Sequence, residues 1–228
     1  LNQNLISLIE YYSLINANLI LSNTPIKRTS NNKATSFSGT KAEKLEKLKK
    51  SFKIIKNCEL KKNAKNLVFG DGNINAKVML IGEGPGANED AEGKPFVGRA
   101  GKLLDKMLAA INLDRSKVYI SNVVNYRPPN NRKPTEEEIE RYLPYLKTHI
   151  EIIRPNIILL LGSTALNALI GSEVVISKAR GKWIQKEIGS IKLWIIASFH
   201  PAFLMRQPEQ KKLAWIDLKM LRDKLKNL

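Results

Sequence analysis

The chain has 228 residues, of which 38 are Lys or Arg and 21 are Asp or Glu, so its formal net charge is +17 at pH 7. Its hydrophobic content of 43% is ordinary for a globular protein and too high for a wholly disordered one. Its one cysteine excludes an intramolecular disulfide and any metal site built from several cysteines. The basic excess favours a polyanionic partner: DNA, RNA or an anionic membrane.

The membrane alternative is the weakest of the three. No apolar run approaches the roughly 18–20 residues that cross a bilayer, and the longest dense run stops at Gly162 after five residues. The first residues carry neither a basic region nor a small-residue cleavage site, so we expect no signal peptide. We therefore expect a cytoplasmic protein with no membrane partner.

The N-terminal part differs in composition from the rest. Residues 1–21 carry apolar residues at helical spacing and predict an amphipathic helix, whereas residues 22–40 are polar and predict a linker. Residues 41–57 predict a short basic helix. We assign residues 1–50 to an N-terminal segment and residues 51–228 to the main domain.

The main domain shows a regular alternation of strands and helices. Four short runs rich in β-branched residues predict strands, at 76–82, 116–124, 156–162 and 191–199. Apolar stripes predict a helix around 103–111 and another around 139–153, before which Thr135 and Glu138 have the spacing of a capping box. This order predicts a three-layer α/β/α sandwich with a central four-stranded parallel sheet. Ligands of such sheets bind beyond the carboxyl ends of the strands.

Two glycine-rich segments follow the first strand. Residues 82–90, GEGPGANED, form a tight loop that lets a ligand approach the backbone, but its acids and the lack of a following Lys argue against a phosphate cradle. A plain strand-to-helix turn explains it equally well. In the next loop, Phe96 has the character of a base-stacking aromatic, although such residues more often anchor a loop to the core.

The second strand ends in a polar residue and a basic loop. Asn122 offers a donor and an acceptor, as reading a pyrimidine edge requires, although a turn-forming Asn is the common alternative. The proline-rich loop at 127–134 carries Arg127 and Arg132 and is suited to phosphate contact, or is simply a solvated loop.

The fourth strand leads directly into a histidine. His200 falls at the expected ligand-binding edge, whereas His149 lies on a predicted helix and is expected at the surface. In the same segment Leu204 and Met205 are unusual for a loop unless they pack inside or wedge into a duplex.

Taken together and in order, these segments resemble the family 4 uracil-DNA glycosylases. The resemblance runs from about Ile55 to the C-terminus. The matching strings are GEGPGANEDAEGKPFVGRAGKLL, ISNVVNYRPPNNRKPTEEEI, RPNIILLLGSTA, ARGKW and HPAFLMRQP. The family hydrolyses the N-glycosidic bond of uracil in DNA, which starts base excision repair, after flipping the base out of the duplex.

The resemblance implies a role for each matching residue. His200 would donate a hydrogen bond to the uracil O2, Asn122 would read the base edge and Phe96 would stack on the ring. Glu83 and Gly84 would lie beside the base. Glu89 and Asn131 would serve catalysis through the water. Leu204, Met205 and Arg206 would contact the DNA, and an apolar side chain among them would fill the gap left by the base.

The chain departs from this family at the cysteines. The family usually binds a [4Fe–4S] cluster through four cysteines, and the corresponding positions here are Ile55, Cys58, Tyr126 and Tyr142. One thiolate cannot hold a cluster that needs four ligands. We therefore expect a protein without the cluster and without another cofactor.

These observations leave two functions open. The first is an active, cluster-free, monofunctional uracil-DNA glycosylase, a monomer associated with the nucleoid of a bacterial-type cell. The alternative is a catalytically impaired DNA-binding relative that acts with replication or repair partners through residues 1–50. An unrelated nucleotide-binding enzyme is disfavoured by the missing phosphate loop.

Overall fold

Six strands form one mixed sheet in the computed structural model, which describes residues 37–56 and 58–228. In the spatial order β1-β3-β2-β4-β6-β5, the four inner strands run parallel and the two edge strands run antiparallel to their neighbours. The predicted parallel sheet is confirmed, and the edge strands are additions to it. The strand bounds are β1 (Asp71–Gly72), β2 (Val78–Gly82), β3 (Val118–Asn122), β4 (Ile157–Leu161), β5 (Trp183–Ile188) and β6 (Ile191–Ser198).

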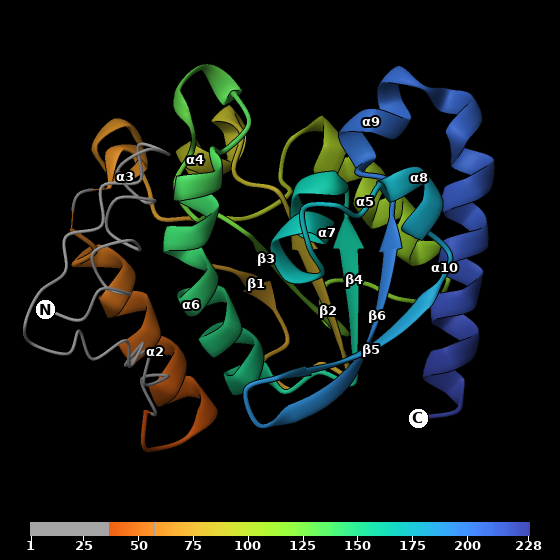
Figure 1. Cartoon of the computed structure of the whole chain (residues 1–228), viewed down its shortest axis with the longest axis horizontal. Coiled ribbons are helices and arrows are strands. Elements are labelled where there is room, and N and C mark those ends of the chain that lie inside the picture. The colour runs from red at the N-terminus through yellow and green to blue at the C-terminus, as the bar shows by residue number, and fades with distance from the viewer. Residues whose placement is uncertain (1–36, 57) are drawn as a thin grey trace, which may run out of the picture. The chain divides into compact units, whose positions relative to one another are not determined.

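Helices cover both faces of the sheet (Figure 1). Side chains of α2, α6 and α7 pack on one face, and those of α5 and α10 pack on the other. None of the helices in the described ranges is both long and apolar enough to cross a bilayer. The helix bounds are α2 (Lys41–Lys53), α3 (Glu59–Asn63), α4 (Ala87–Glu92), α5 (Arg99–Ala109), α6 (Glu136–Ile153), α7 (Ser163–Leu169), α8 (Ile176–Ala179), α9 (Pro201–Arg206) and α10 (Lys211–Lys226), with 3-10 turns η1 (Pro129–Asn131) and η2 (Pro208–Gln210).

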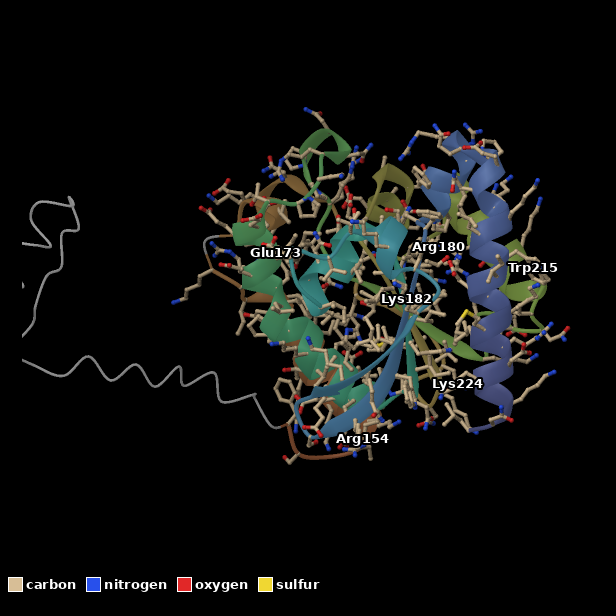
Figure 2. All side chains as sticks on the ribbon, turned by 45° about the vertical axis from the view of Figure 1, so that its right-hand side comes forward. Arg154, Glu173, Arg180, Lys182, Trp215 and Lys224 are labelled. Carbon is tan, nitrogen blue, oxygen red and sulfur yellow. The ribbon has the colours of Figure 1, made fainter. Side chains whose placement is uncertain are left out.

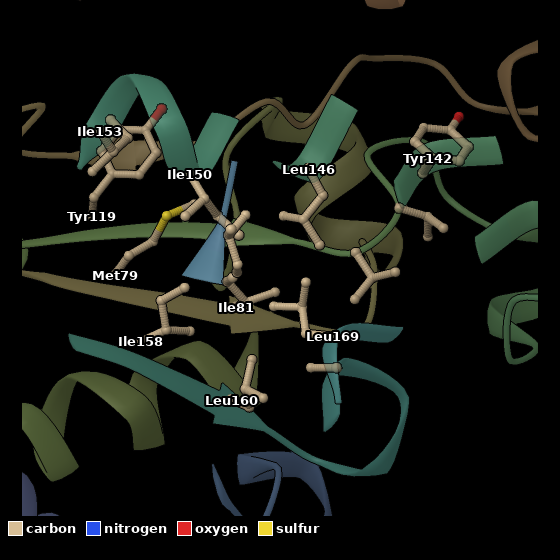
Figure 3. Close-up of a cluster of buried hydrophobic side chains, with 14 of the residues drawn as sticks. Met79, Ile81, Tyr119, Tyr142, Leu146, Ile150, Ile153, Ile158, Leu160 and Leu169 are labelled. Carbon is tan, nitrogen blue, oxygen red and sulfur yellow. The ribbon is translucent and has the colours of Figure 1, made fainter. Parts of the chain in front are cut away.

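The inner strands are apolar because both of their faces are buried. Successive side chains of a strand point to opposite faces, so Met79 and Ile81 of β2 meet Leu146 and Ile150 of α6 (Figure 3). The intervening residues of β2 pack against α5 and α10 on the other face. Every residue of β2, β3 and β4 is buried, which is why their sequences show continuous apolar runs and no alternation.

Helix α6 begins as predicted and departs from prediction at its histidine. The capping box between Thr135 and Glu138 is present. His149, however, is only 1% exposed, and its Nε2 lies 2.9 Å from the hydroxyl of Tyr119. The expectation of a surface histidine was wrong because this residue shares the inner face of α6 with Leu146 and Ile150.

Helix α2 packs in the same core as the sheet. The division predicted between residues 50 and 51 runs through this helix, and Leu48 and Phe52, one on each side of it, are both buried in one cluster. Helix α2 is thus part of the folded domain and not of an appendage. The amphipathic helix predicted at 1–21 and most of the linker predicted at 22–40 lie outside the described residues.

Candidate active site

A cavity of about 550 Å³ opens at the carboxyl ends of the parallel strands. The chain places β3 on one side of β2 and β4 on the other, so the strand order reverses at this point, where ligands of open α/β sheets bind. The loops after β2, β3, β4 and β6 all contribute to its walls. The cavity brings together eight of the residues singled out from the sequence: Glu83, Gly84, Glu89, Phe96, Asn131, Arg132, His200 and Arg206.

His200 presents a neutral imidazole to this cavity. It caps the N-terminus of α9, and its Nδ1 accepts a hydrogen bond from the backbone N–H of Ala202 at 3.1 Å. The neutral ring therefore carries its proton on Nε2. Burial, assisted by the positive charge of Arg206 and opposed by Glu89, lowers the pKa of His200 to about 4. At neutral pH the residue is thus an uncharged donor.

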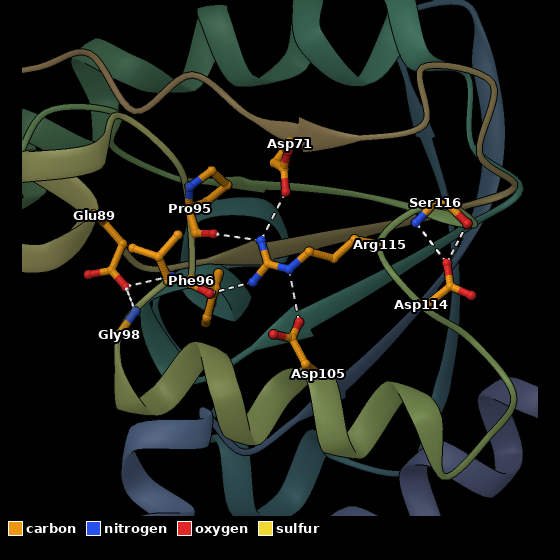
Figure 4. Close-up of polar contacts among 10 residues, drawn as sticks. Asp71, Glu89, Pro95, Phe96, Gly98, Asp105, Asp114, Arg115 and Ser116 are labelled. Carbon is orange, nitrogen blue, oxygen red and sulfur yellow. Dashed lines mark hydrogen bonds and ion pairs between the residues drawn. The ribbon is translucent and has the colours of Figure 1, made fainter.

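Phe96 is held in a strained backbone conformation. Its φ is +55°, in the left-handed region that bulky residues avoid. The guanidinium of Arg115 donates to the Phe96 carbonyl and pairs with Asp71 and Asp105, each at 2.9 Å (Figure 4). Gly101 is needed beneath the loop because a Cβ there would collide with the same carbonyl. Arg115, which is itself held by Asp71 and Asp105, and the close approach of Gly101 thus fix the backbone of the residue that carries this aromatic ring.

Glu89 ties the two loops after β2 together. Its Oε1 accepts from the backbone N–H groups of Val97 at 2.9 Å and Gly98 at 2.8 Å, and its Oε2 accepts from Gly86 at 3.1 Å. The carboxylate therefore caps α4 and orders the segment that carries Phe96, while it also lines the cavity.

Asn122 lies just behind the cavity wall. It is 2% exposed, and within the described part of the chain its Oδ1 has no hydrogen-bond partner. A Cβ on Gly82 would lie 2.5 Å from both this oxygen and the ring of Phe96, so only glycine lets the two side chains converge there. A buried acceptor without a partner costs about 1–3 kcal/mol, and a ligand N–H would relieve that cost.

Glu83 is held by the helix that follows β4. Thr164 of α7 donates its hydroxyl proton to the Glu83 carboxylate. The backbone of Gly84 lies against Val124, which is tight enough that a side chain at position 84 would collide with it. The arrangement fixes one carboxylate at the rim of the cavity.

The basic loop after β3 is internally bonded. Arg127 does not line the cavity, and its Nε donates to the Oδ1 of Asn131 at 2.8 Å. Arg132 pairs with Glu138 through two bonds of 2.8 and 2.6 Å. Asn131 has a φ of +55°, so Arg127 and the strained turn together set the direction of its amide.

The matching family model and two similar relatives point to the uracil-DNA glycosylases. The family model described as the uracil DNA glycosylase superfamily matches residues 69–219. The chain belongs to this superfamily. It is 41% identical over 174 residues to the type-4 uracil-DNA glycosylase of Archaeoglobus fulgidus, covering 75% of this chain and 87% of that protein. It is 44% identical over 168 residues to the type-4 enzyme of Thermotoga maritima, covering 73% and 86%.

Against the expectation for this superfamily, Leu204 does not face the outside. It is 1% exposed and packs in the core with residues of α5 and α10. Met205 is half-buried and does not line the cavity, whereas Phe203 of the same helix does. The sequence predicts a loop here, but the segment forms the helix α9, and the helical turn points Leu204 inward.

Several residues of the glycosylase cavity were not predicted from the sequence. Phe199 and Phe203 lie close to His200 in the sequence, and Ser163 follows the third predicted strand. These three residues therefore lie just after strands, where the sequence predicts that a ligand binds. Ile176 comes from α8, where no sequence signal pointed to the site.

The four positions where this family usually carries cluster cysteines are filled by packed side chains. Ile55, Cys58, Tyr126 and Tyr142 are all buried in one core cluster. The Sγ of Cys58 lies 3.1 Å from the hydroxyl of Tyr142. Burial raises the pKa values of both tyrosines, so both stay protonated. These residues do not fit an iron–sulfur cluster, and in the described part of the chain no group of three or more His, Cys, Asp or Glu is placed to hold a metal.

Proposed function

We propose that the protein is a DNA-repair hydrolase that removes uracil from DNA by cleaving its N-glycosidic bond and leaves an abasic site. One observation carries the proposal: in a member of this superfamily, a neutral histidine with Nε2–H available shares a cavity with a fixed aromatic ring at the carboxyl edge of the sheet. The cavity is of the size that binds small ligands, and the formal charge of +17 suits a DNA substrate.

The reaction requires that the target nucleotide leave the base stack, which costs a few kcal/mol and less for a mispaired base. The bond between uracil and C1′ of the deoxyribose then breaks, and its electron pair leaves with the base. Water adds to the positively charged sugar and gives up a proton. The site must therefore stabilise a uracil anion and position one water.

His200 is the proposed stabiliser of the anion. Its Nε2–H donates to uracil O2, where negative charge develops, and a donor of this kind contributes about 2.7–4 kcal/mol. Asn122 reads the base edge, because its Oδ1 lacks a partner and uracil N3–H is a donor. Phe96 supplies the stacking surface.

The remaining polar groups serve the water and the base. Glu83 and Gly84 lie beside the base, with the Glu83 carboxylate fixed by Thr164. Glu89 and Asn131 act through the water. The three backbone bonds of Glu89 give that residue a second task, which is to hold the Phe96 loop.

Basic residues around the rim contact the DNA phosphates. Arg132 and Arg206 line the cavity itself, and Arg127 acts beside them through Asn131. On α9, Met205 and Phe203 are the apolar side chains available to fill the gap left by the base, since Leu204 is buried.

We further propose that the enzyme works as a monomer without an iron–sulfur cluster or another cofactor. The contact between Cys58 and Tyr142 and the packing of Tyr126 occupy the space where ligands would be needed. We also propose that the protein acts at the chromosome, in the cytoplasm and nucleoid of a bacterial-type cell, because the proposed substrate is DNA.

The test is incubation of the full chain with an oligonucleotide that contains one uracil, followed by alkali to reveal abasic sites. Strand cleavage at uracil but not at thymine in the same position supports the proposal. Retained salt-sensitive DNA binding without cleavage would instead favour the alternative, a DNA-binding relative that has lost catalysis.

A further inference from the structure

A buried ion pair lies beside the end of β6, the strand that leads to His200. Arg180, at the end of α8, pairs with Asp217 of α10, and Figure 2 shows Arg180 beside that helix. Asp217 is fully buried, and the Nε of Arg180 donates to its Oδ2 at 3.0 Å. Arg180 belongs to the ARGKW segment, and the proposed reaction assigns no role to any residue of that segment.

The carboxylate of Asp217 also binds the end of β6. The hydroxyl of Ser198, two residues before His200, donates to Asp217 Oδ2 at 2.7 Å. Burial raises the pKa of Asp217, and the bonds from Arg180 and Ser198 act against that effect. One carboxylate thus joins α8, α10 and β6.

The segment from Ser198 to His200 is fixed from three sides. The Ser198 carbonyl accepts from the N–H of Gly162 at 2.9 Å, and the Arg180 guanidinium lies 5.7 Å from the centre of the Phe199 ring, which lines the cavity. His200 itself has its Nδ1 tied to Ala202. Every one of these contacts constrains where the imidazole points.

We infer that Arg180 and Asp217 are positioning residues that hold Ser198 and Phe199, and through them aim the imidazole of His200 into the cavity. The catalytic consequence rests on the proposed function. Well-packed apolar residues often replace a buried ion pair without loss of stability, because removing two charges from water is costly. A role in aiming His200 explains why charged groups occupy this place.

The test compares Asp217→Asn with Asp223→Asn, the same chemical change at an exposed position of α10. The first variant should lower kcat for uracil excision about ten- to a hundredfold, the range expected when a catalytic group is misplaced, with KM changed less than twofold. The control variant should leave both constants unchanged. A purely structural role predicts a fall in thermal stability with kcat per folded molecule unchanged.

A second readout does not depend on activity. The chain has two histidines, so the imidazole nitrogen signals of His200 and His149 can be followed separately by NMR. Asp217→Asn should shift the His200 signals and leave those of His149 in place. If the His200 signals do not move, the inference is wrong, whether or not the wild type excises uracil.

Ser198→Ala covers the case in which Asp217→Asn does not fold. It keeps the ion pair and removes only the hydroxyl bond between β6 and α10. It should lower kcat several-fold and shift the His200 signals in the same direction. Unchanged signals in this variant would overturn the inference equally.

Discussion

The imidazole of His200 and the phenyl ring of Phe96 lie with their centroids 5.5 Å apart and their planes tilted by 30°. The two residues come from loops after different strands, and each loop is fixed independently: one by Arg115 and Glu89, the other by Gly162 and Asp217. A flat base that stacks on Phe96 would therefore lie next to the neutral imidazole of His200, which lines the same cavity.

His200→Ala should reduce kcat for uracil excision about a hundred- to a thousandfold, because one donor to the developing anion is lost. DNA affinity should persist, since the phosphate contacts remain. Single-turnover kinetics on a uracil oligonucleotide measure the first quantity and a salt-dependent binding titration the second. An unchanged rate would show that His200 does not stabilise the anion.

Asn122→Ala should lower kcat/KM for uracil about ten- to a hundredfold, as expected for the loss of a buried, oriented hydrogen bond worth roughly 1–3 kcal/mol. The same change removes an acceptor that lacks a partner in the free protein. Thermal unfolding should therefore show little loss of stability. A large fall in Tm together with normal kcat/KM would mean that Asn122 is structural.

Arg115→Met should release the Phe96 loop, because the guanidinium bonds to the Pro95 and Phe96 carbonyls disappear together with both ion pairs. Activity should fall, and proteolysis within residues 93–99 should become faster. Arg222→Met is the matched control, since Arg222 makes one exposed pair with Asp223. Equal effects of the two substitutions would contradict the proposed constraint on Phe96.

The unfolding free energy should decrease as the pH falls below about 6.5. Burial lowers the pKa of His149 to about 3 and that of His200 to about 4, so between these values and 6.5 the unfolded chain binds more protons than the folded one. His149→Gln should weaken this dependence, as measured by urea unfolding at pH 7 and pH 4.5. An equally steep dependence in the variant would contradict the assignment to His149.

Chelators should not destabilise the protein, because packing of Tyr126 and Tyr142 occupies the place of the cluster. Tyr142→Phe, which removes the hydroxyl beside Cys58, should lower the unfolding free energy by about 0.5–1.5 kcal/mol, the usual worth of a hydrogen bond. Iron analysis and thermal melts with and without chelator measure both. Stoichiometric iron that is lost together with stability would refute this expectation.

The inner strands and the start of α6 could be predicted from the sequence because each leaves a local signal. Buried parallel strands are continuous apolar runs, and the capping box before α6 needs only Thr135 and Glu138. Edge strand β5 was missed although Gly189 and Ser190 form a two-residue hairpin turn between Ile188 and Ile191, a recognisable pattern.

Other features depend on tertiary contacts that no local pattern reports. Leu204 and His149 were misplaced because the inward face of a helix is set by what it packs against. The bonds of Glu89 to the backbone of Val97 and Gly98 join segments eight and nine residues apart. Ile176 reaches the cavity from a helix of four residues.

The most direct test of the account is uracil excision by a wild-type preparation whose iron content is measured in the same sample. The account predicts alkali-labile sites at uracil, none at thymine, and iron far below one atom per chain. Absence of cleavage with intact DNA binding, or cleavage that requires stoichiometric iron, would contradict it.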